Sequence, residues 1–466
     1  MDRRDFMRTS AHVALGAPII RHAHLWTGGM DPVMPSSTEG LILPAADRMA
    51  WWREARFGMF VHWGLYAILA GEWEGKTNYG EWIRNNAKIP LDTYNRLLER
   101  WNPRDFDADG LARMAKAAGM RYLVITTKHH DGFALWPSAH GDFNVARTGV
   151  TRDIMREVSD ACRRHGVVPC WYHSIMDWHH PDYLPRRDWE AANRPAAGAS
   201  FDRYVQFLHA QVEELLTHYG DIGVMWFDGE WESTWTRDLG AALAVKCRHL
   251  QANVIVNNRV APNRAGMLDA KVGGIGDFGT PEQNIPDRGL PGVDWEACMT
   301  MNQNWGYNRA DRDFKSVATL VGMVSDTASK GGNLLLNVGP MASGALPTES
   351  IDRLQGLASW MAVHGEAIHG TIASPFEGAP FRATRKAVGD GEALNVFLPQ
   401  WPASHELLLP GLRTVPTQAT LYGQRTRNLL PVRAVDAGVV VTLPPQPTDS
   451  VCSVLRLQAP KPFRVG

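Results

Sequence analysis

Short apolar runs alternate with amphipathic segments from about residue 50 to residue 364. The runs suit strands that are buried on both faces, and the segments between them have the period of a helix. Strands are predicted over 57–64, 121–128, 167–173, 224–228, 253–259 and 333–340. Helices are predicted over 51–55, 111–118, 153–165, 201–219, 241–250, 314–330 and 351–364. This alternation predicts an α/β fold with a parallel sheet, in the form of a (β/α)8-like (TIM-type) barrel.

The alternation is interrupted once and then ends. Residues 265–305 are rich in Gly and Pro, and we predict no strand there. After about Gly370, short apolar runs are separated by Pro and Gly turns, which predicts strands over 393–398, 406–409, 419–422, 438–443 and 451–457. This spacing is typical of an antiparallel β-sandwich. We therefore expect a barrel domain over 45–370 and a C-terminal sandwich over 371–466.

The first 44 residues have the features of an export signal followed by a linker. The paired Arg3 and Arg4, with Phe6 and Arg8 after them, resemble a twin-arginine signal. The mildly apolar run over 9–20 is too short to span a membrane, and Pro, Ser and Gly are frequent up to residue 44. On this interpretation the protein is periplasmic or secreted; an ordinary basic N-terminus is the alternative. No later stretch is a candidate membrane span.

Composition excludes several classes of partner. The formal net charge is -1, so neither nucleic acid nor an anionic membrane surface is expected to bind. The 5 cysteines are scattered without zinc-site spacing, which argues against a disulfide framework or a structural zinc. The 18 tryptophans, many of them next to His, Asp, Glu or Gly, suit stacking against sugar rings. The alternative is that these tryptophans have no role in sugar binding and reflect only the size of an aromatic-rich barrel. Nothing in the sequence indicates the oligomeric state.

Polar side chains fall at the ends of the predicted strands. His62, the His129-His130 pair, Asp228 and Arg259 each end an apolar run. Because the carboxyl ends of barrel strands meet on one face, these residues predict a shared polar pocket. Taken alone, a histidine at a strand end is more often structural. A metal-hydrolase site is disfavoured by the lack of a His-X-His on the first strand, and neither a metal nor another cofactor is expected.

Glycoside hydrolysis requires two carboxyl groups, and Asp228 is the first candidate. Trp226 precedes it closely, as suits a site that binds a sugar. The second carboxyl group must come from another loop, and the stretch over 265–305 offers Glu282 and Glu296. Glu282 follows Gly279-Thr280-Pro281, and Glu296 follows Trp295, whose apolar wall would favour its acid form. A solvated loop carboxylate is the alternative for each.

Five motifs, in this order, resemble the α-L-fucosidases of glycoside hydrolase family 29. They are MFVHWG at 59–64, GEW at 80–82, KHHDGF at 128–133, WFDG at 226–229 and GNLLLNVGP at 332–340. KHHDGF and GNLLLNVGP are specific, whereas WFDG is specific only in their company. The resemblance runs from about Ala46 to Gly370, and a C-terminal β domain is part of the family layout.

The resemblance implies an exo-acting, retaining hydrolase that releases terminal α-L-fucose from glycans by double displacement, without a metal. It implies Asp228 as the nucleophile and Glu282 as the acid/base, with Glu296 as the runner-up. The residues implied in binding the sugar are His62, Glu81, Trp82, His129, His130, Trp226, Arg259 and Trp305. Two alternatives stay open: a related glycosidase for another deoxysugar or galactose, and a fucose-binding protein with an inactive site.

Overall fold

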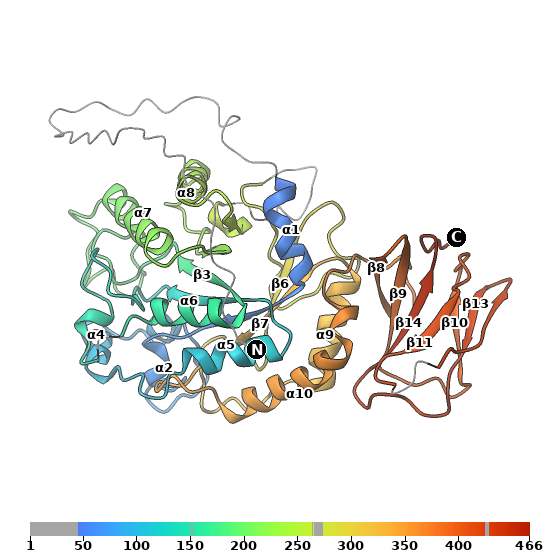
Figure 1. The fold of residues 1–466 in the computed structure, drawn as a ribbon. Coiled ribbons are helices and arrows are strands. Elements are labelled where there is room, and N and C mark those ends of the chain that lie inside the picture. The colour runs from blue at the N-terminus through green and yellow to red at the C-terminus, as the bar shows by residue number, and fades with distance from the viewer. Residues whose placement is uncertain (1–44, 151, 263, 265–273, 425–427) are drawn as a thin grey trace, which may run out of the picture. The chain divides into compact units, whose positions relative to one another are not determined.

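The structure is a computed structural model that describes residues 45–150, 152–262, 264, 274–424 and 428–466 (Figure 1). The predicted export signal and linker over 1–44 lie outside the described residues. No helix among the described residues is both long enough and apolar enough to cross a membrane.

A parallel sheet forms the centre of the larger part of the chain, as the apolar runs predict. Its strands are β1 (Phe57–Val61), β2 (Tyr122–Lys128), β3 (Val168–Ser174), β4 (Val224–Asp228), β5 (Ile255–Val256), β6 (Glu296–Thr300) and β7 (Asn333–Val338). Within the described residues they pair in the order β5-β4-β3-β2-β1-β7-β6. The gap between β5 and β6 is spanned by isolated parallel bridges from Asn257 to Phe278, from Gly279 to Trp295 and from Glu282 to Cys298. The sheet therefore curves into the predicted barrel, with residues 278–282 as an irregular seam.

The structure differs from the sequence prediction at this seam. We predicted no strand over 265–305, but β6 lies there and is buried along its whole length. The strand begins with a buried glutamate, Glu296, so its sequence lacks the continuous apolar run from which the other strands were predicted. The predicted strand over 253–259 is reduced to the two residues of β5, and a 3-10 turn, η3 (Asn258–Val260), follows it.

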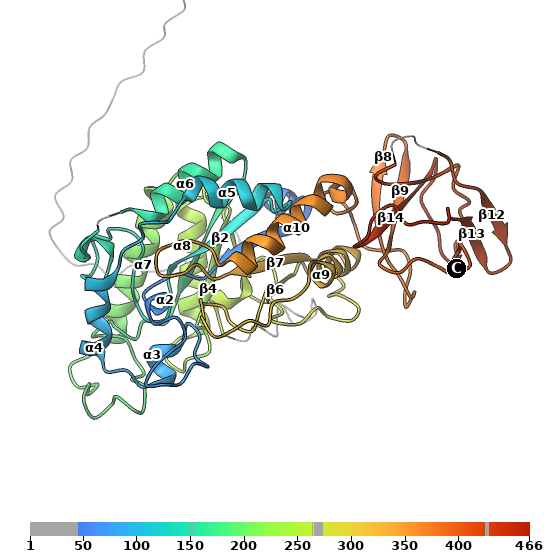
Figure 2. The same ribbon diagram turned by 90° about the horizontal axis from the view of Figure 1, so that it is seen from below.

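Helices cover the outer face of the sheet (Figures 1 and 2). They are α5 (Ala108–Ala117), α6 (Ile154–His165), α7 (Phe201–Thr217), α8 (Arg237–Leu250), α9 (Val317–Ser329) and α10 (Thr348–His364). Shorter elements are α2 (Tyr66–Leu69), α3 (Ile83–Asn86), α4 (Leu91–Asn95), η1 (Arg96–Arg100), η2 (Val145–Arg147) and η5 (Gly365–Ala367). Side chains cap the starts of α5 to α9; for example, Asp107 accepts from Gly110 N and Ser200 accepts from Arg203 N. Helix α6 ends on Gly166 at a φ of 65°, a left-handed conformation that favours glycine.

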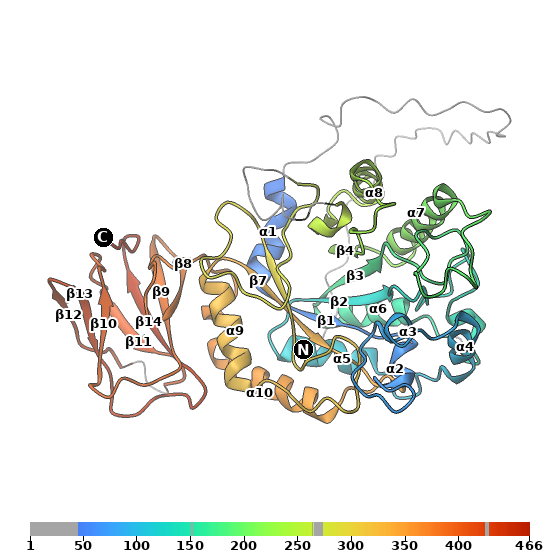
Figure 3. The ribbon, with the colours of Figure 1, turned by 180° about the vertical axis from the view of Figure 1, so that it is seen from behind.

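Alternate residues of the strands fill the barrel interior. The N-terminal helix α1 (Ala45–Ala55) covers one end of the barrel, and Figure 3 shows it beside β6 and β7. The aromatic ring of Trp52 on α1 packs 4.8 Å from that of Phe278, and its carbonyl accepts from Asn333 Nδ2 at 2.8 Å. The opposite end of the barrel, where the carboxyl ends of the strands lie, is therefore the end at which polar side chains gather.

The C-terminal part consists of two antiparallel sheets, as predicted (Figure 1). Their strands are β8 (Arg382–Val388), β9 (Gly391–Leu398), β10 (Glu406–Pro410), β11 (Gln418–Leu421), β12 (Val432–Val435), β13 (Gly438–Thr442) and β14 (Ser453–Ala459). The sequence pattern missed β8 and β12, which are largely unburied and contain basic residues within the strand. A separate apolar core lies between the sheets. Trp360 of α10 donates to the carbonyl of Cys452 at 2.8 Å, which ties this core to the barrel helices.

Candidate active site

A polar cavity of about 90 Å³ opens among the carboxyl ends of the barrel strands. It is lined by Phe60, His62, Glu81, Trp82, His129, Tyr172, Trp226, Asp228, Trp231, Arg259, Glu282, Cys298 and Trp305. All but two of the residues that the sequence assigned to a site are among them. The exceptions are His130, which lies against Asp228, and Glu296, which lies deeper in the barrel.

Asp228 is the last residue of β4, and its carboxylate is held from three sides. Arg259 Nη1 donates to Oδ1 at 2.8 Å and the hydroxyl of Tyr172 donates to Oδ2 at 3.2 Å. His130 Nε2 lies 3.4 Å from the same Oδ2. Burial alone would raise the pKa of Asp228, but the charge of Arg259 and the contact with His130 hold it well below its usual range. Asp228 is therefore a carboxylate throughout the neutral range, oriented towards the cavity.

Arg259 joins the two candidate carboxyl groups. Besides its bond to Asp228, its Nη2 donates to Glu282 Oε2 at 2.8 Å, while Nε donates to the hydroxyl of Thr280 at 2.8 Å. The guanidinium lies 4.6 Å from the ring centroid of Trp226, close enough for a cation–π contact. With the plane of the guanidinium fixed in this way, the two carboxyl groups on its terminal nitrogens are close neighbours.

The seam of the barrel positions Glu282. Its backbone bridges to Cys298 of β6, and the next residue, Gln283, donates to the Cys298 carbonyl at 3.0 Å. The Glu282 side chain is 38% exposed, compared with 12% for that of Asp228. A carboxyl group that combines solvent access with a fixed backbone can exchange a proton with water, as an acid/base group must.

Glu296 is not brought into the cavity. Its side chain lies in the barrel interior, where it accepts from the Tyr122 hydroxyl and, at 3.0 Å, from Trp226 Nε1. It is 1% exposed, and burial raises the pKa of this carboxyl to about 7. Burial thus favours its acid form, but the group supports the floor of the cavity through Trp226 and does not face a ligand.

A buried asparagine fixes the proton of His62. Asn337 Nδ2 donates to the carbonyl of Trp305 at 2.7 Å, and Asn337 Oδ1 lies 2.7 Å from His62 Nδ1. A carbonyl only accepts, so the amide nitrogen faces Trp305 and the amide oxygen faces the imidazole. His62 therefore carries its proton on Nδ1. Burial lowers the pKa of His62 to about 4, so at neutral pH its Nε2 is an unprotonated acceptor.

The two adjacent histidines both reach the site because β2 ends before them. The pairing of β2 with β3 shifts register at Lys128, and His129 and His130 follow outside the strand. The ring of His129 stacks on that of Tyr172 at 5.5 Å, and its Nδ1 has no hydrogen-bond partner among the described residues. Burial lowers the pKa of His129, so this nitrogen belongs to a neutral ring. Because Nδ1 is itself buried, a ligand in the cavity would meet the other edge of this ring.

A buried ion pair anchors this histidine segment from behind. Lys128 Nζ lies 3.2 Å from Asp177 Oδ2, and both side chains are nearly inaccessible to solvent. Asp177 also accepts from the backbone N–H groups of His179 and His180, at 3.0 and 2.8 Å. Neither of these two histidines lines the cavity. They serve the framework of the site.

Glu81, Trp82 and Trp305 complete the wall. Glu81 is buried, its Oε2 accepts from Gly306 N at 3.2 Å, and burial raises the pKa of its carboxyl. Trp82 packs edge-on against His130 at 5.0 Å, and Trp305 packs 5.1 Å from His62. Glu81 and Trp82, which the resemblance implied in binding the sugar, therefore both line the cavity.

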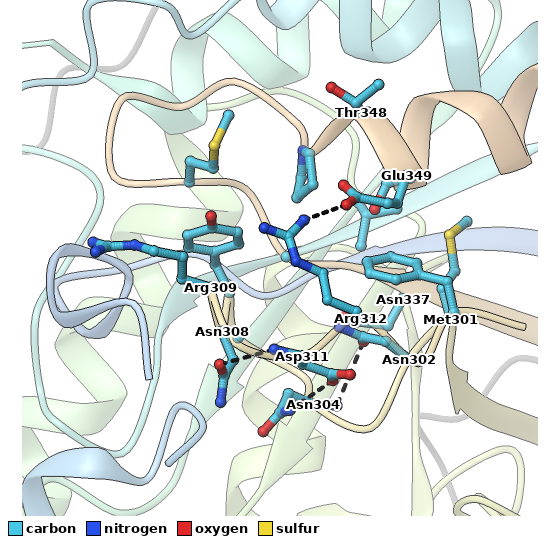
Figure 4. Close-up of a pocket in the computed structure, with 18 residues that line it drawn as sticks. Met301, Asn302, Asn304, Asn308, Arg309, Asp311, Arg312, Asn337, Thr348 and Glu349 are labelled. Atoms are coloured by element: carbon cyan, nitrogen blue, oxygen red, sulfur yellow. Dashed lines mark hydrogen bonds and ion pairs between the residues drawn. The ribbon is translucent and has the colours of Figure 1, made fainter. Parts of the chain in front are cut away.

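Figure 4 shows a second polar cavity, of about 180 Å³, along the loop that carries Trp305. Polar side chains bind one another there: Arg312 pairs with Glu349, and Asp311 accepts from Asn304 Nδ2 at 2.7 Å. Asn337 lies at its wall. This network braces the Trp305 loop and links it to His62.

Sequence reasoning missed several residues of the site. Tyr172 and Phe60 lie inside predicted strands, where an inward-facing aromatic residue looks like core. Cys298 lies on the strand that was not predicted, and burial raises the pKa of its thiol well above the usual range. Asn337 was part of a recognised motif, but its contact with His62 joins residues far apart in the sequence. Among the described residues, no group of three or more His, Cys, Asp or Glu side chains has the arrangement of a metal site.

Comparisons with known proteins agree on one family. The family model described as Alpha-L-fucosidase matches residues 42–366. The plasma alpha-L-fucosidase of Rattus norvegicus is 31% identical over 428 residues, which cover 85% of this chain and 87% of that protein. The human tissue alpha-L-fucosidase is 28% identical over 421 residues, covering 86% of each.

Solved structures give the same result. Alpha-L-fucosidase isoenzyme 1 from Paenibacillus thiaminolyticus is 35% identical with a TM-score of 0.80, covering 89% of this chain and 99% of that one. A GH29 alpha-L-fucosidase from Bacteroides thetaiotaomicron, trapped as a covalent intermediate with 2-fluoro-fucosyl fluoride in a Glu-to-Gln mutant, is 30% identical with a TM-score of 0.80. The alignment covers 92% of this chain and 98% of that one.

Proposed function

The chain belongs to the α-L-fucosidase family and is a glycoside hydrolase, and from this premise we propose that it releases terminal α-L-fucose from fucosylated glycans using Asp228 and Glu282. Retention of configuration by double displacement agrees with the covalent intermediate trapped in the similar Bacteroides enzyme.

The observation that carries these roles is the bridge made by Arg259. It holds Asp228 and Glu282 on the two terminal nitrogens of one guanidinium, at 2.8 Å each. Retaining glycosidases need two carboxyl groups about 5 to 5.5 Å apart, because one of them attacks the sugar directly. Close neighbours on one guanidinium suit that spacing, whereas Glu296 does not reach the cavity.

In the first step, an Asp228 carboxylate oxygen attacks the anomeric carbon of fucose and the bond from that carbon to the glycosidic oxygen breaks. Glu282 gives its proton to the departing oxygen, so the aglycone leaves as an alcohol. In the second step, Glu282 takes a proton from water, whose oxygen attacks the anomeric carbon and releases Asp228. Fucose leaves, and both carboxyl groups return to their starting forms.

The neutral histidines define which hydroxyl groups the sugar must present. His62 Nε2 accepts and cannot donate, because Asn337 fixes its proton on Nδ1. Glu81 and His129 add further polar contacts, while Phe60 and Trp305, whose ring centroids lie 5.8 Å apart, form an apolar wall. Such a wall suits the methyl group of fucose better than the hydroxymethyl group of galactose.

We expect Asn337→Ala to lower kcat/KM on α-L-fucosides by about 10- to 100-fold, as removal of one oriented hydrogen bond does near a reacting centre. Without the amide, His62 loses the acceptor that fixes its tautomer and the Trp305 loop loses one anchor. Steady-state kinetics measure the loss, and Asn337→Asp separates the two roles. Aspartate keeps an acceptor for His62 and loses the donor to Trp305. Equal activity of wild type and Asn337→Ala would contradict this positioning role.

The activity itself is tested by release of 4-nitrophenol from 4-nitrophenyl α-L-fucoside, with the 4-nitrophenyl galactosides as the comparison. We expect turnover of the fucoside and little of the galactosides. Preference for a galactoside would favour the related glycosidase, and binding of fucose without any turnover would favour the inactive binding protein.

Export to the periplasm or beyond is also part of this proposal and rests on the paired Arg3 and Arg4. Changing both to lysine should hold the activity in the cytoplasmic fraction of a bacterial host. An unchanged distribution of activity between cell fractions would contradict export by a twin-arginine signal.

A further inference from the structure

An open groove lies beside the active-site cavity, between the loops that follow β4 and β5. It has a volume of about 540 Å³ and is lined by Glu230, Trp231, Glu232, Ser233, Trp235, Pro262 and Arg264. Trp231 also lines the active-site cavity, so the two spaces meet at this indole. The groove therefore adjoins the cavity that Asp228 and Glu282 line.

Trp231 is held in place and yet exposed. Its ring lies nearly parallel to that of Trp82, with centroids 6.3 Å apart, and the Arg264 guanidinium lies 5.5 Å from its centroid. Even so, 47% of the residue remains exposed, and no other aromatic residue is among the exposed large hydrophobic residues that the structure describes. A fixed and exposed indole beside a sugar site has the character of a stacking platform, since aromatic faces bind the C–H faces of pyranose rings.

The charges of the groove are matched. Arg264 Nε donates to Glu230 Oε1 at 2.6 Å, and Arg187 Nη2 donates to Glu232 Oε1 at 2.5 Å. Two carboxylates therefore face two guanidinium groups. Glu230 is 3% exposed, and its Oε2 has no hydrogen-bond partner within the described part of the chain. A surface whose charges are balanced in this way suits the hydroxyl groups of a neutral sugar rather than an anion.

We propose that this groove is the subsite for the sugar to which fucose is attached, a neutral pyranose that packs on Trp231. The inference rests on the proposed fucosidase function and adds the place on this chain, and the residue, that hold the aglycone sugar. Trp231 thereby acts as a specificity-determining residue.

The test compares two substrates that share fucose and differ in aglycone. One is α-L-fucosyl fluoride, whose leaving group is too small to reach the groove. The other is the best substrate among fucosyl disaccharides with α1-2, α1-3, α1-4 and α1-6 linkages. For each variant, the quantity compared is the ratio of kcat/KM for the disaccharide to kcat/KM for the fluoride.

We expect Trp231→Ala to lower this ratio by about 10- to 100-fold, in line with the loss of one sugar–aromatic contact. Ser233→Ile, which adds bulk to an exposed position of the groove, should lower the ratio as well. It keeps the inference testable if the Trp231→Ala protein does not fold. Trp401→Ala, in the C-terminal sandwich, is the matched control and should leave the ratio unchanged.

An unchanged ratio in both groove variants would overturn the inference, whether the two rates stay at the wild-type level or fall together. A wild type that turns over neither the fluoride nor any disaccharide would instead overturn the proposed function, and this inference with it. The two failures are therefore distinguishable from the wild-type rates alone.

Discussion

Asp228→Gly is expected to reduce turnover of 4-nitrophenyl α-L-fucoside by on the order of 10⁴-fold or more, because the covalent route is lost with the nucleophile. The glycine leaves space on the attacking side of the sugar, so sodium azide should restore part of the rate. The azide ion takes the place of the missing carboxylate and forms a fucosyl azide. Spectrophotometric assays with and without azide measure both effects, and NMR of the product identifies its anomeric configuration.

Asp390→Gly is a suitable control, since this exposed aspartate lies in the turn between β8 and β9, far from the cavity in sequence and fold. It should keep wild-type activity. An Asp228→Gly protein that melts normally and retains substantial activity without azide would exclude Asp228 as the nucleophile. Loss of turnover without azide rescue, in a folded protein that still binds fucose, would leave the nucleophile role without support and favour a purely electrostatic one.

The second large effect separates the two glutamates. Glu282→Ala should lower kcat/KM on a fucosyl disaccharide by about 10² to 10⁴-fold, the usual range for loss of a general acid. The loss should be smaller on 4-nitrophenyl α-L-fucoside, whose leaving group scarcely needs protonation, and azide should accelerate release of the fucosyl-enzyme. Glu296→Gln should stay within about threefold of wild type on both substrates, because Glu296 faces the barrel interior rather than the cavity. Azide rescue of a Glu296 variant, with Glu282→Ala fully active, would reverse the two roles.

Glu296 should appear instead in the pH dependence of stability. Its folded-state pKa of about 7 lies above the value of about 4.3 in an unfolded chain, so the folded state binds the extra proton. Stability is therefore expected to fall as the pH rises from about 4.3 through about 7, by about 4 kcal/mol for this group. Glu296→Gln should flatten that decline. Urea unfolding at pH 5 and pH 8 measures it, and an equal decline in wild type and variant would contradict the assignment.

The sequence predicted what depends on local pattern. The apolar runs identified most barrel strands, and the polar residues that end them, such as His62, Asp228 and Arg259, do meet in one cavity. The pattern failed where a buried polar residue replaces an apolar one, as Glu296 does at the start of β6. It also gave no access to pairings between distant segments, such as His62 with Asn337 or Glu282 with Arg259. These contacts form only when the barrel closes, and the spacing of apolar residues along the chain carries no information about that closure.

The bridge made by Arg259 also has a consequence for the two halves of the proposed cycle. Before attack, the site holds one cation, one anionic Asp228 and a protonated Glu282; in the ester intermediate Asp228 is neutral and Glu282 is the anion. The total charge around the guanidinium is the same in both states, and the negative partner only moves from Nη1 to Nη2. A single buried arginine therefore neutralises the anion on either side, so that neither half-reaction leaves a carboxylate of the site without its cationic partner.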